Sequence, residues 1–184
     1  MPAGIARCGA CLREPPPLDG CVAAVGYGYP WDRSIVALKF RGEPGLARAL
    51  SQLLRSAPWV EPALEAADVV CAMPLSAERL RERGFNQSAL LVRRLAPAHG
   101  DVSTLLRIRH TPALSGMDRR SRQAQVRGAF AVEPSRIGRI AGRRVLLVDD
   151  VMTSGATLHE AARTLRQAGA ASVSAVVLAR TPRG

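Results

Sequence analysis

The sequence predicts an α/β protein, with an open, mostly parallel sheet flanked by helices. Three short, nearly continuous apolar runs have the composition of strands that are covered on both faces: DVVCAMP (68–74), RRVLLVDD (143–150) and SVSAVVLAR (172–180). Stretches with apolar residues at helical spacing alternate with these runs, and the turns between them are short. The length of 184 residues suits one main domain with a substantial core.

The elements of the first half follow this alternation. CVAAVGYGY (21–29) reads as a strand, and Asp32 is positioned to cap a short helix after it. A second helix is expected after Pro44, with leucines on one face. Residues 75–87 are polar and basic, so we expect a charged loop there, followed by a helix over 88–95.

In the second half, residues 105–127 carry many arginines and few apolar residues, which predicts a mobile segment with one short helix. GAFAV (128–132) is expected to return to a strand. After the run at 143–150, apolar residues at helical spacing predict a helix that Gly169 ends, before the last strand at 172–180.

The net charge of +11 depends on arginine, because Lys39 is the only lysine. Arginine binds phosphates through a planar fork of donors, so polyanionic partners fit this composition. A G+C-rich genome would produce the same excess, and charge alone does not decide between the two explanations. No apolar run approaches the roughly 18 residues of a membrane span, and residues 1–13 lack the apolar core of a signal peptide. We therefore expect a cytoplasmic protein without membrane insertion.

The first 20 residues are expected to form a segment separate from the globular domain of 21–184. This segment is rich in Pro, Gly and Cys. Cys8 and Cys11 have the spacing of half a zinc site, but a tetrahedral site needs four ligands and no second pair follows. We therefore expect neither a complete Zn²⁺ site nor a disulfide framework in this chain.

The stretch VLLVDDVMTSGATL (145–158) places two adjacent acids at the end of a buried strand. In open α/β sheets, ligands bind beyond the carboxyl ends of the strands. Asp149 and Asp150 would repel each other if both were buried and ionised, so we expect them to face a polar cleft. Ribose hydroxyls, with or without Mg²⁺, would satisfy both carboxylates.

The residues after the acids predict a phosphate-binding turn at the start of a helix. Free backbone N–H groups and the positive end of the helix dipole favour an anion there. Gly155 allows close approach of the backbone, and the hydroxyls of Thr153, Ser154 and Thr157 add donors. Acids for a diol beside a turn for a phosphate describe a ribose 5-phosphate. An ordinary strand-turn-helix corner with Ser and Thr caps is the alternative.

Residues 145–157 resemble the phosphoribosyl pyrophosphate (PRPP) motif of the type I phosphoribosyltransferases: four apolar residues, two acids, two apolar residues, then Thr-Ser/Thr-Gly-x-Thr. A second stretch, Pro-Leu followed by RLRERGFNQ within 74–87, is similar to the signature of the ComF branch of this family. The resemblance covers about residues 22–181. Typical ComF proteins begin with two zinc-binding CxxC pairs, and Cys8 and Cys11 resemble the second pair with the first absent.

The resemblance implies a PRPP site with three parts. Asp149 and Asp150 are the implied catalytic residues, which hold the ribose hydroxyls and, directly or indirectly, Mg²⁺. The residues implied to bind PRPP through its 5-phosphate are Val151, Met152, Thr153, Ser154, Gly155, Ala156 and Thr157. The implied pyrophosphate loop contains Leu75, Arg79, Arg81, Arg83, Gly84 and Asn86, and its three arginines supply forked donors at alternate positions. Lys39 is a further candidate, and a solvated basic loop is the alternative for 79–87.

The function implied by the resemblance is binding of PRPP or a related phosphosugar in a protein of DNA uptake, or competence. Single-stranded DNA and proteins of the uptake machinery are the implied partners. Enzymatic chemistry would be displacement of pyrophosphate from C1 of the ribose, but no residue stands out as a general base or as the reader of an acceptor.

Two other functions fit the same fold: a non-catalytic nucleic-acid-binding or regulatory module, and an active transferase of nucleotide salvage. Eleven arginines between residues 79 and 127 favour contact with a nucleic-acid backbone. Phe85 is the only aromatic residue in that segment, so base stacking has little support there.

Overall fold

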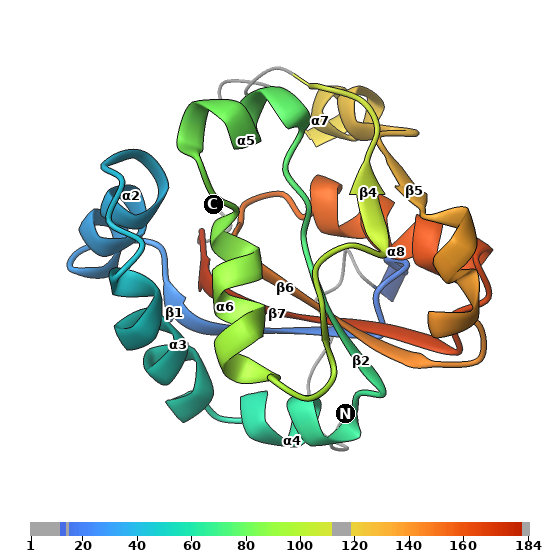
Figure 1. Ribbon diagram of the computed structural model, residues 1–184, viewed down its shortest axis with the longest axis horizontal. Coiled ribbons are helices and arrows are strands. Elements are labelled where there is room, and N and C mark those ends of the chain that lie inside the picture. Colours follow the sequence, from blue (N-terminus) through green and yellow to red (C-terminus); the bar gives the residue numbers. More distant parts are fainter. Residues whose placement is uncertain (1–11, 14, 112–118, 182–184) are drawn as a thin grey trace.

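The computed structural model describes residues 12–13, 15–111 and 119–181, so Cys8 and Cys11 lie outside the described residues. Its centre is a five-stranded sheet with the order β1-β7-β6-β2-β3, and every neighbouring pair is parallel (Figure 1). The strands are β1 (Gly20–Gly26), β2 (Val69–Ala72), β3 (Gly100–Asp101), β6 (Arg144–Met152) and β7 (Ser172–Arg180). The open parallel α/β sheet expected from the sequence is confirmed.

The central strand β6 shows why these strands read as continuous apolar runs. It lies between β7 and β2, and its alternate side chains enter two separate cores. Leu146 and Val148 pack into the core on one face of the sheet, and Val145 and Leu147 pack into the core on the other. Because both faces are covered, no polar residue interrupts the run until the acids.

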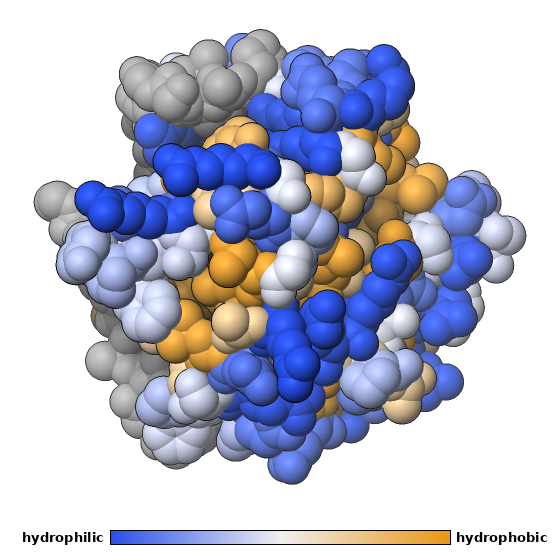
Figure 2. All heavy atoms as spheres, turned by 60° about the vertical axis from the view of Figure 1, so that its left-hand side comes forward, coloured by the Kyte–Doolittle hydropathy of each residue, from blue (hydrophilic) through white to orange (hydrophobic). Residues whose placement is uncertain are grey.

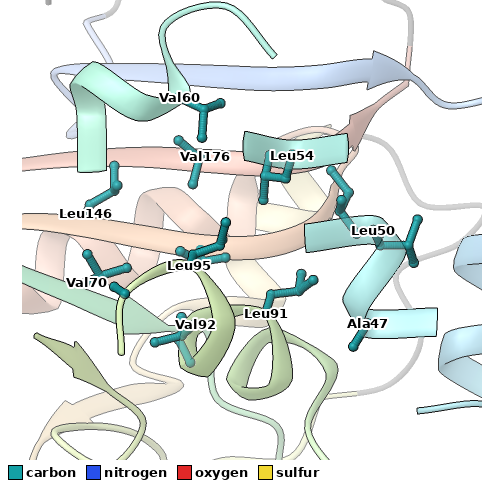
Figure 3. Packing of buried hydrophobic residues seen from close by; sticks show 14 of the residues in the cluster. Ala47, Leu50, Leu54, Val60, Val70, Leu91, Val92, Leu95, Leu146 and Val176 are labelled. Carbon is teal, nitrogen blue, oxygen red and sulfur yellow. The ribbon is translucent and has the colours of Figure 1, made fainter. Parts of the chain in front are cut away.

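Four helices cover the first face of the sheet: α2 (Trp31–Phe40), α3 (Leu46–Ser56), α4 (Val60–Ala66) and α6 (Gln87–Leu95). Figure 3 shows side chains of α3, α4 and α6 meeting those of the sheet, among them Leu54, Leu91, Leu95, Val70, Leu146 and Val176. Each fully buried leucine stabilises the fold by ~1.5–3 kcal/mol, so this layer fixes where α2 and α6 meet the sheet.

The second face is covered by α8 (Ala156–Gln167) and by a small antiparallel pair, β4 (Leu105–Arg107) and β5 (Phe130–Val132). The remaining elements on this side are α7 (Arg119–Val126) and the 3₁₀ helix η1 (Pro134–Arg139). None of the helices in the described part of the chain is long and apolar enough to cross a membrane.

The charged loop expected over 75–87 is wrong for most of its length. Residues 77–83 form helix α5 (Ala77–Arg83), which begins after Ser76 and ends at Gly84 with a φ of 75°. The Ser76 hydroxyl accepts a hydrogen bond from the backbone N–H of Arg79 at 3.4 Å. No residue of α5 is buried, so no apolar face revealed this helix in the sequence.

Other differences are smaller. The Asp32 cap is wrong: α2 begins at Trp31, directly after Pro30, and Asp32 lies in its first turn, where its charge still favours the helix dipole. The irregular segment expected from residue 105 did not include the strand β4. This strand has three residues and is too short to show alternation of apolar and polar side chains. The strand expected over 21–29 ends at Gly26. Elements that were not predicted also include α4, β3 and η1.

Asn86 links α6 to the end of β2. Its Oδ1 accepts hydrogen bonds from the backbone N–H groups of Ser88 at 2.9 Å and Ala89 at 3.4 Å. Its Nδ2 donates to the carbonyl of Met73 at 3.0 Å. The amide of Asn86, a residue expected in the pyrophosphate loop, is therefore engaged within the protein at both its oxygen and its nitrogen.

Asn86→Ala should lower the free energy of unfolding by about 1–2 kcal/mol, because the first N–H groups of α6 lose their cap. Urea denaturation measures this change. Asn86→Asp keeps the capping oxygens and should recover most of the loss, whereas equal stability of Asn86→Ala and the wild type would contradict the capping role.

Candidate functional site

A cleft of about 800 Å³ lies beyond the carboxyl ends of β2 and β6. Its wall combines the end of α2, one side of α5, β4 and the segment after it, α7, and the turn between β6 and α8. The lining residues are Lys39, Phe40, Gly42, Arg79, Glu82, Arg83, Arg107, Thr111, Arg122, Thr153 and Thr157. Five of these are cations and one is a carboxylate, so the described lining carries a clear excess of positive charge.

The two acids lie directly behind this wall. Asp150 is 3% exposed; its Oδ1 accepts from the backbone N–H of Val151 at 2.6 Å, and its Oδ2 lies 2.9 Å from Nζ of Lys39. Oδ1 of Asp149 accepts from the Ser88 hydroxyl at 3.0 Å and from the Asp150 N–H at 2.9 Å. Lys39 thus belongs to the cleft wall and neutralises one acid at the same time.

Burial raises the pKa of Asp149 well above its usual range, and the charge of Asp150 acts in the same direction. Lys39 and the two hydrogen bonds oppose this shift without cancelling it. The two acids were expected to face a polar cleft, but neither of them lines the cleft itself.

The turn after β6 brings two of the predicted hydroxyl residues to the cleft. Thr153 and Thr157 line it, and the helix α8 starts at Ala156, directly after Gly155 with a φ of 80°. The φ of Gly155 lies in the left-handed region that L side chains rarely adopt, so the turn favours glycine there. The first N–H groups of α8 have no acceptor within the helix, which makes this end suitable for a phosphate.

The other residues of the predicted turn do not line the cleft. Met152 and Ala156 are buried, at 5% and 4% exposure, and Met152 packs in the core under α8. Val151 packs against the opposite core. Ser154 is half-buried, and its Oγ accepts from the Ala156 N–H at 3.4 Å.

The helical form of α5 changes which of its arginines act together. Side chains four residues apart share one side of a helix, whereas a residue midway between them points elsewhere. Arg79 and Arg83 line the cleft, and Arg81 is exposed and does not. Leu75 and Gly84 also lie outside the lining. The expectation of three arginines acting at alternate positions is therefore replaced by a pair on one side of α5.

Arg83 is held in place by two contacts. Its Nη1 donates to Oε1 of Gln87 at 3.3 Å, and its guanidinium lies 4.7 Å from the centre of the Phe40 ring. Arg79 donates from Nη2 to the carbonyl of Thr111 at 3.1 Å.

Arg107, Arg122, Thr111 and Phe40 line the cleft although no site role was predicted for them. The sequence showed an excess of arginines over 79–127, but it did not show which ones converge. Arg107 is brought in by β4, an element too short to recognise, and Phe40 is brought in by the burial of α2.

The acids fit Mg²⁺ that arrives with a ligand. No group of three or more His, Cys, Asp or Glu in the described part of the chain is placed to hold a metal ion. Mg²⁺ commonly takes one or two carboxylates and completes its shell with substrate phosphates and water. Asp149 and Asp150 would be those carboxylates, and the ion would neutralise charge on a bound diphosphate.

Asp149→Asn should raise the melting temperature, and the gain should widen as the pH rises from about 4 to 8. The pKa of Asp149 is raised in the folded state, so the stability that its neutral form contributes at low pH is lost as the carboxyl ionises. The gain should reach a few degrees, at ~2–4 °C per kcal/mol. Thermal unfolding at several pH values measures it.

Asp68→Asn is the matched control. Hydrogen bonds from Arg144 hold the pKa of Asp68 below its usual range, so this variant should lose stability at pH 8. If the difference in melting temperature between Asp149→Asn and the wild type does not change with pH, the raised pKa of Asp149 is contradicted.

The chain was compared with protein families and with solved structures. Residues 89–184 match the phosphoribosyl transferase domain family. A structural comparison aligns 74% of the chain with 26% of a glutamine PRPP amidotransferase from Bacillus subtilis, at 23% identity and a TM-score of 0.44. The chain therefore spans about a quarter of that protein's length.

Three relatives are named for DNA utilization or for competence. DNA utilization protein YhgH of Salmonella typhimurium is 34% identical over 180 residues, which cover 95% of this chain and 78% of the relative. Competence protein F of Haemophilus influenzae is 32% identical over 182 residues, with the same coverage of 95% and 78%. Competence protein ComFC of Bacillus subtilis is 36% identical over 117 residues, 61% of this chain and 45% of the relative. The chain belongs to the type I phosphoribosyltransferase family, in its ComF-like branch.

Proposed function

We propose that this protein binds PRPP together with Mg²⁺ in the cleft beyond β2 and β6. The observation that supports the proposal is that one cleft combines the turn at the start of α8 with arginines of α5 and β4, two features whose chemistry suits phosphates. The acid pair lies behind the wall between them. PRPP has a 5-phosphate, a ribose diol and a diphosphate, and each would meet a matching group.

In this proposal, Thr153, Thr157 and the first N–H groups of α8 bind the 5-phosphate. Asp149 and Asp150 take the ribose hydroxyls or the Mg²⁺ that accompanies the diphosphate. Ribose binding moves the Lys39 ammonium from Asp150 to a ligand phosphate, because the ion pair now stands between the acid and the cleft. Arg79 and Arg83 neutralise the diphosphate.

If PRPP is turned over, the reaction is displacement of pyrophosphate from C1 of the ribose by a nucleophile. Cations placed around the leaving group would stabilise the charge that develops on it. Glu82 is the carboxylate that lines the cleft among the described residues, and it lies on the same helix as the diphosphate arginines. The site therefore supports leaving-group departure more clearly than activation of an acceptor.

We further propose that the protein acts in the cytoplasm on DNA that has been taken up, in transformation. The names of the relatives, DNA utilization protein and Competence protein F, support this role. A salvage transferase would need a binding site for its acceptor. Among the described residues that line the cleft, the arginines are suited to phosphate, and no residue is as clearly suited to an acceptor.

A second candidate function is binding of single-stranded nucleic acid. Figure 2 shows the side of the molecule on which α2 and α3 lie, where hydrophilic side chains surround a central group of hydrophobic ones. Tyr29 and Phe40, at the two ends of α2, are 78% and 66% exposed, and guanidiniums of Arg33 and Arg83 lie 5.3 and 4.7 Å from their rings. Exposed rings paired with arginine are the components of a base-stacking surface.

Arg83→Met should weaken PRPP binding about tenfold or more, because a charge-assisted contact to the diphosphate is lost. Arg81→Met removes the same charge from the opposite side of α5 and should leave the affinity within about twofold of the wild type. Titration calorimetry with PRPP and Mg²⁺ compares them.

Asp149→Asn should also lose PRPP affinity even though it is expected to be the more stable protein. The proposal fails if the wild type does not bind PRPP in the presence of Mg²⁺.

Tyr29→Ala should weaken binding of a thymine oligonucleotide several-fold in a low-salt gel-shift assay, since stacking contributes ~1–3 kcal/mol per base. PRPP affinity should not change, because Tyr29 does not line the cleft. No retardation of the oligonucleotide by the wild type would remove nucleic-acid binding as a function.

A further inference from the structure

The cation that contacts the acid pair differs in kind from every other side-chain cation of the lysine and arginine type in the chain. Lys39 is the only lysine among 26 lysines and arginines. It lies in the last turn of α2, next to the fully buried Leu38, and its Nζ lies 2.9 Å from Oδ2 of Asp150. A lysine ends in a compact point charge, whereas an arginine ends in a broad planar fork. The most compact cation available therefore stands at the acid.

The ion pair of Lys39 and Asp150 is largely removed from solvent. The two side chains are 19% and 4% exposed. Oδ1 of Asp150 accepts from the N–H of Val151, but apart from the ammonium no described residue offers a hydrogen-bond donor to the buried Oδ2. A buried carboxylate without a partner is costly, so this oxygen requires a cation, and Lys39 supplies it.

The charge of the same ammonium also acts on Asp149. Burial raises the pKa of Asp149, the charge of Asp150 raises it further, and Lys39 acts in the opposite direction. The two acids are adjacent in the chain and are joined by the hydrogen bond from the Asp150 N–H to Oδ1 of Asp149. One monovalent cation balances only one of two carboxylates, so the pair still attracts a divalent ion.

A divalent ion and the ammonium would compete for the same side of Asp150. Mg²⁺ binds carboxylate oxygens at about 2.0–2.1 Å. Lys39 lines the cleft, so its ammonium stands on the side of the acid from which an ion would arrive. Two cations at one buried oxygen repel each other strongly, because solvent screens them poorly there. A ligand phosphate in the cleft would give the ammonium another partner and remove this obstacle.

We infer that Lys39 holds the cation position of the acid pair and excludes free divalent ions from it until a phosphate ligand in the cleft takes the ammonium. The inference rests on the proposed function for the identity of the ligand. It adds that Lys39 is a specificity-determining residue, which selects a divalent ion that arrives with a phosphate over the free ion. Metal and phosphate then bind cooperatively, and the coupling is reciprocal.

The test is binding of Mn²⁺ alone, measured by electron paramagnetic resonance and by titration calorimetry. Lys39→Met removes the competing cation, so it should bind Mn²⁺ about tenfold or more tightly than the wild type does. Saturating ribose 5-phosphate should tighten Mn²⁺ binding to the wild type about fivefold or more. The same addition should have a smaller effect on Lys39→Met, because no ammonium has to move.

Arg41→Met is the matched control. Arg41 follows α2, two residues after Lys39; it is exposed and does not line the cleft. Its removal changes the net charge by the same amount, so the affinity for Mn²⁺ should stay within about twofold of the wild type. The double variant Lys39→Met/Asp150→Asn lacks the acid as well and should lose the gain in Mn²⁺ affinity.

Thermal unfolding provides a second readout. Lys39→Met leaves Asp150 buried without its partner, so it should melt below the wild type, and Mn²⁺ should restore part of the loss. The melting temperature of the wild type should change little with Mn²⁺ alone. Lys39→Gln keeps a donor for Asp150 without the charge. It replaces Lys39→Met if that variant does not fold, and it should also bind Mn²⁺ more tightly than the wild type.

The outcomes separate this inference from the function it rests on. Equal affinity of the wild type and the Lys39 variants for Mn²⁺ alone would overturn the inference. A gain in Arg41→Met as large as that in Lys39→Met would also overturn it, because net charge and not the ion pair would then keep the ion out. The titrations with Mn²⁺ alone contain no PRPP, so failure of the wild type to bind PRPP with Mg²⁺ would overturn only the proposed function.

Discussion

Parallel pairing of β2 with β6 joins Val69 to Val145 and Ala72 to Val148, so the carboxyl ends of these two strands lie side by side. The contact continues beyond β2, where the N–H of Met73 donates to the carbonyl of Val148 at 3.0 Å. The acids lie near the end of β6 and the turn that starts α8 follows it, while α5 with its arginines follows β2. Because both strands are buried between helical layers, this placement is as rigid as the core itself. The positions of the acids, of the turn before α8 and of the arginines of α5 all depend on that pairing.

Electrostatics explains why the site is costly to keep without a ligand. An acid pair with one raised pKa lies behind the wall, and five cations face the cleft across from a single carboxylate in the described lining. The ion pair of Lys39 with Asp150 reduces both the repulsion between the acids and the excess of positive charge, since Lys39 also lines the cleft. Functional sites commonly store such strain, and the surrounding core compensates for it. The arrangement suits a ligand that brings both negative charge and a divalent cation.

Much of this could be predicted from the sequence where the signal is local. The apolar runs of β6 and β7 identify strands covered on both faces, and the two acids and Gly155 identify the turn from β6 into α8 because that signal lies in adjacent residues. The helix α5 could not be recognised, since it has no buried face, and β4 is too short to show a period. As a result, Arg81 was grouped with Arg79 and Arg83, and Arg107 was missed. Convergence of residues far apart in the chain is a tertiary property, which a single sequence does not display.

The central claim is that one cleft receives all three parts of PRPP. A crystal structure of the wild-type protein with PRPP and Mg²⁺ tests it most directly. The account predicts the 5-phosphate against the N–H groups that begin α8, the ribose hydroxyls at Asp149 and Asp150, and the diphosphate between α5 and β4. Electron density for the ligand outside this cleft, or in it with the two phosphate ends reversed, would contradict the account.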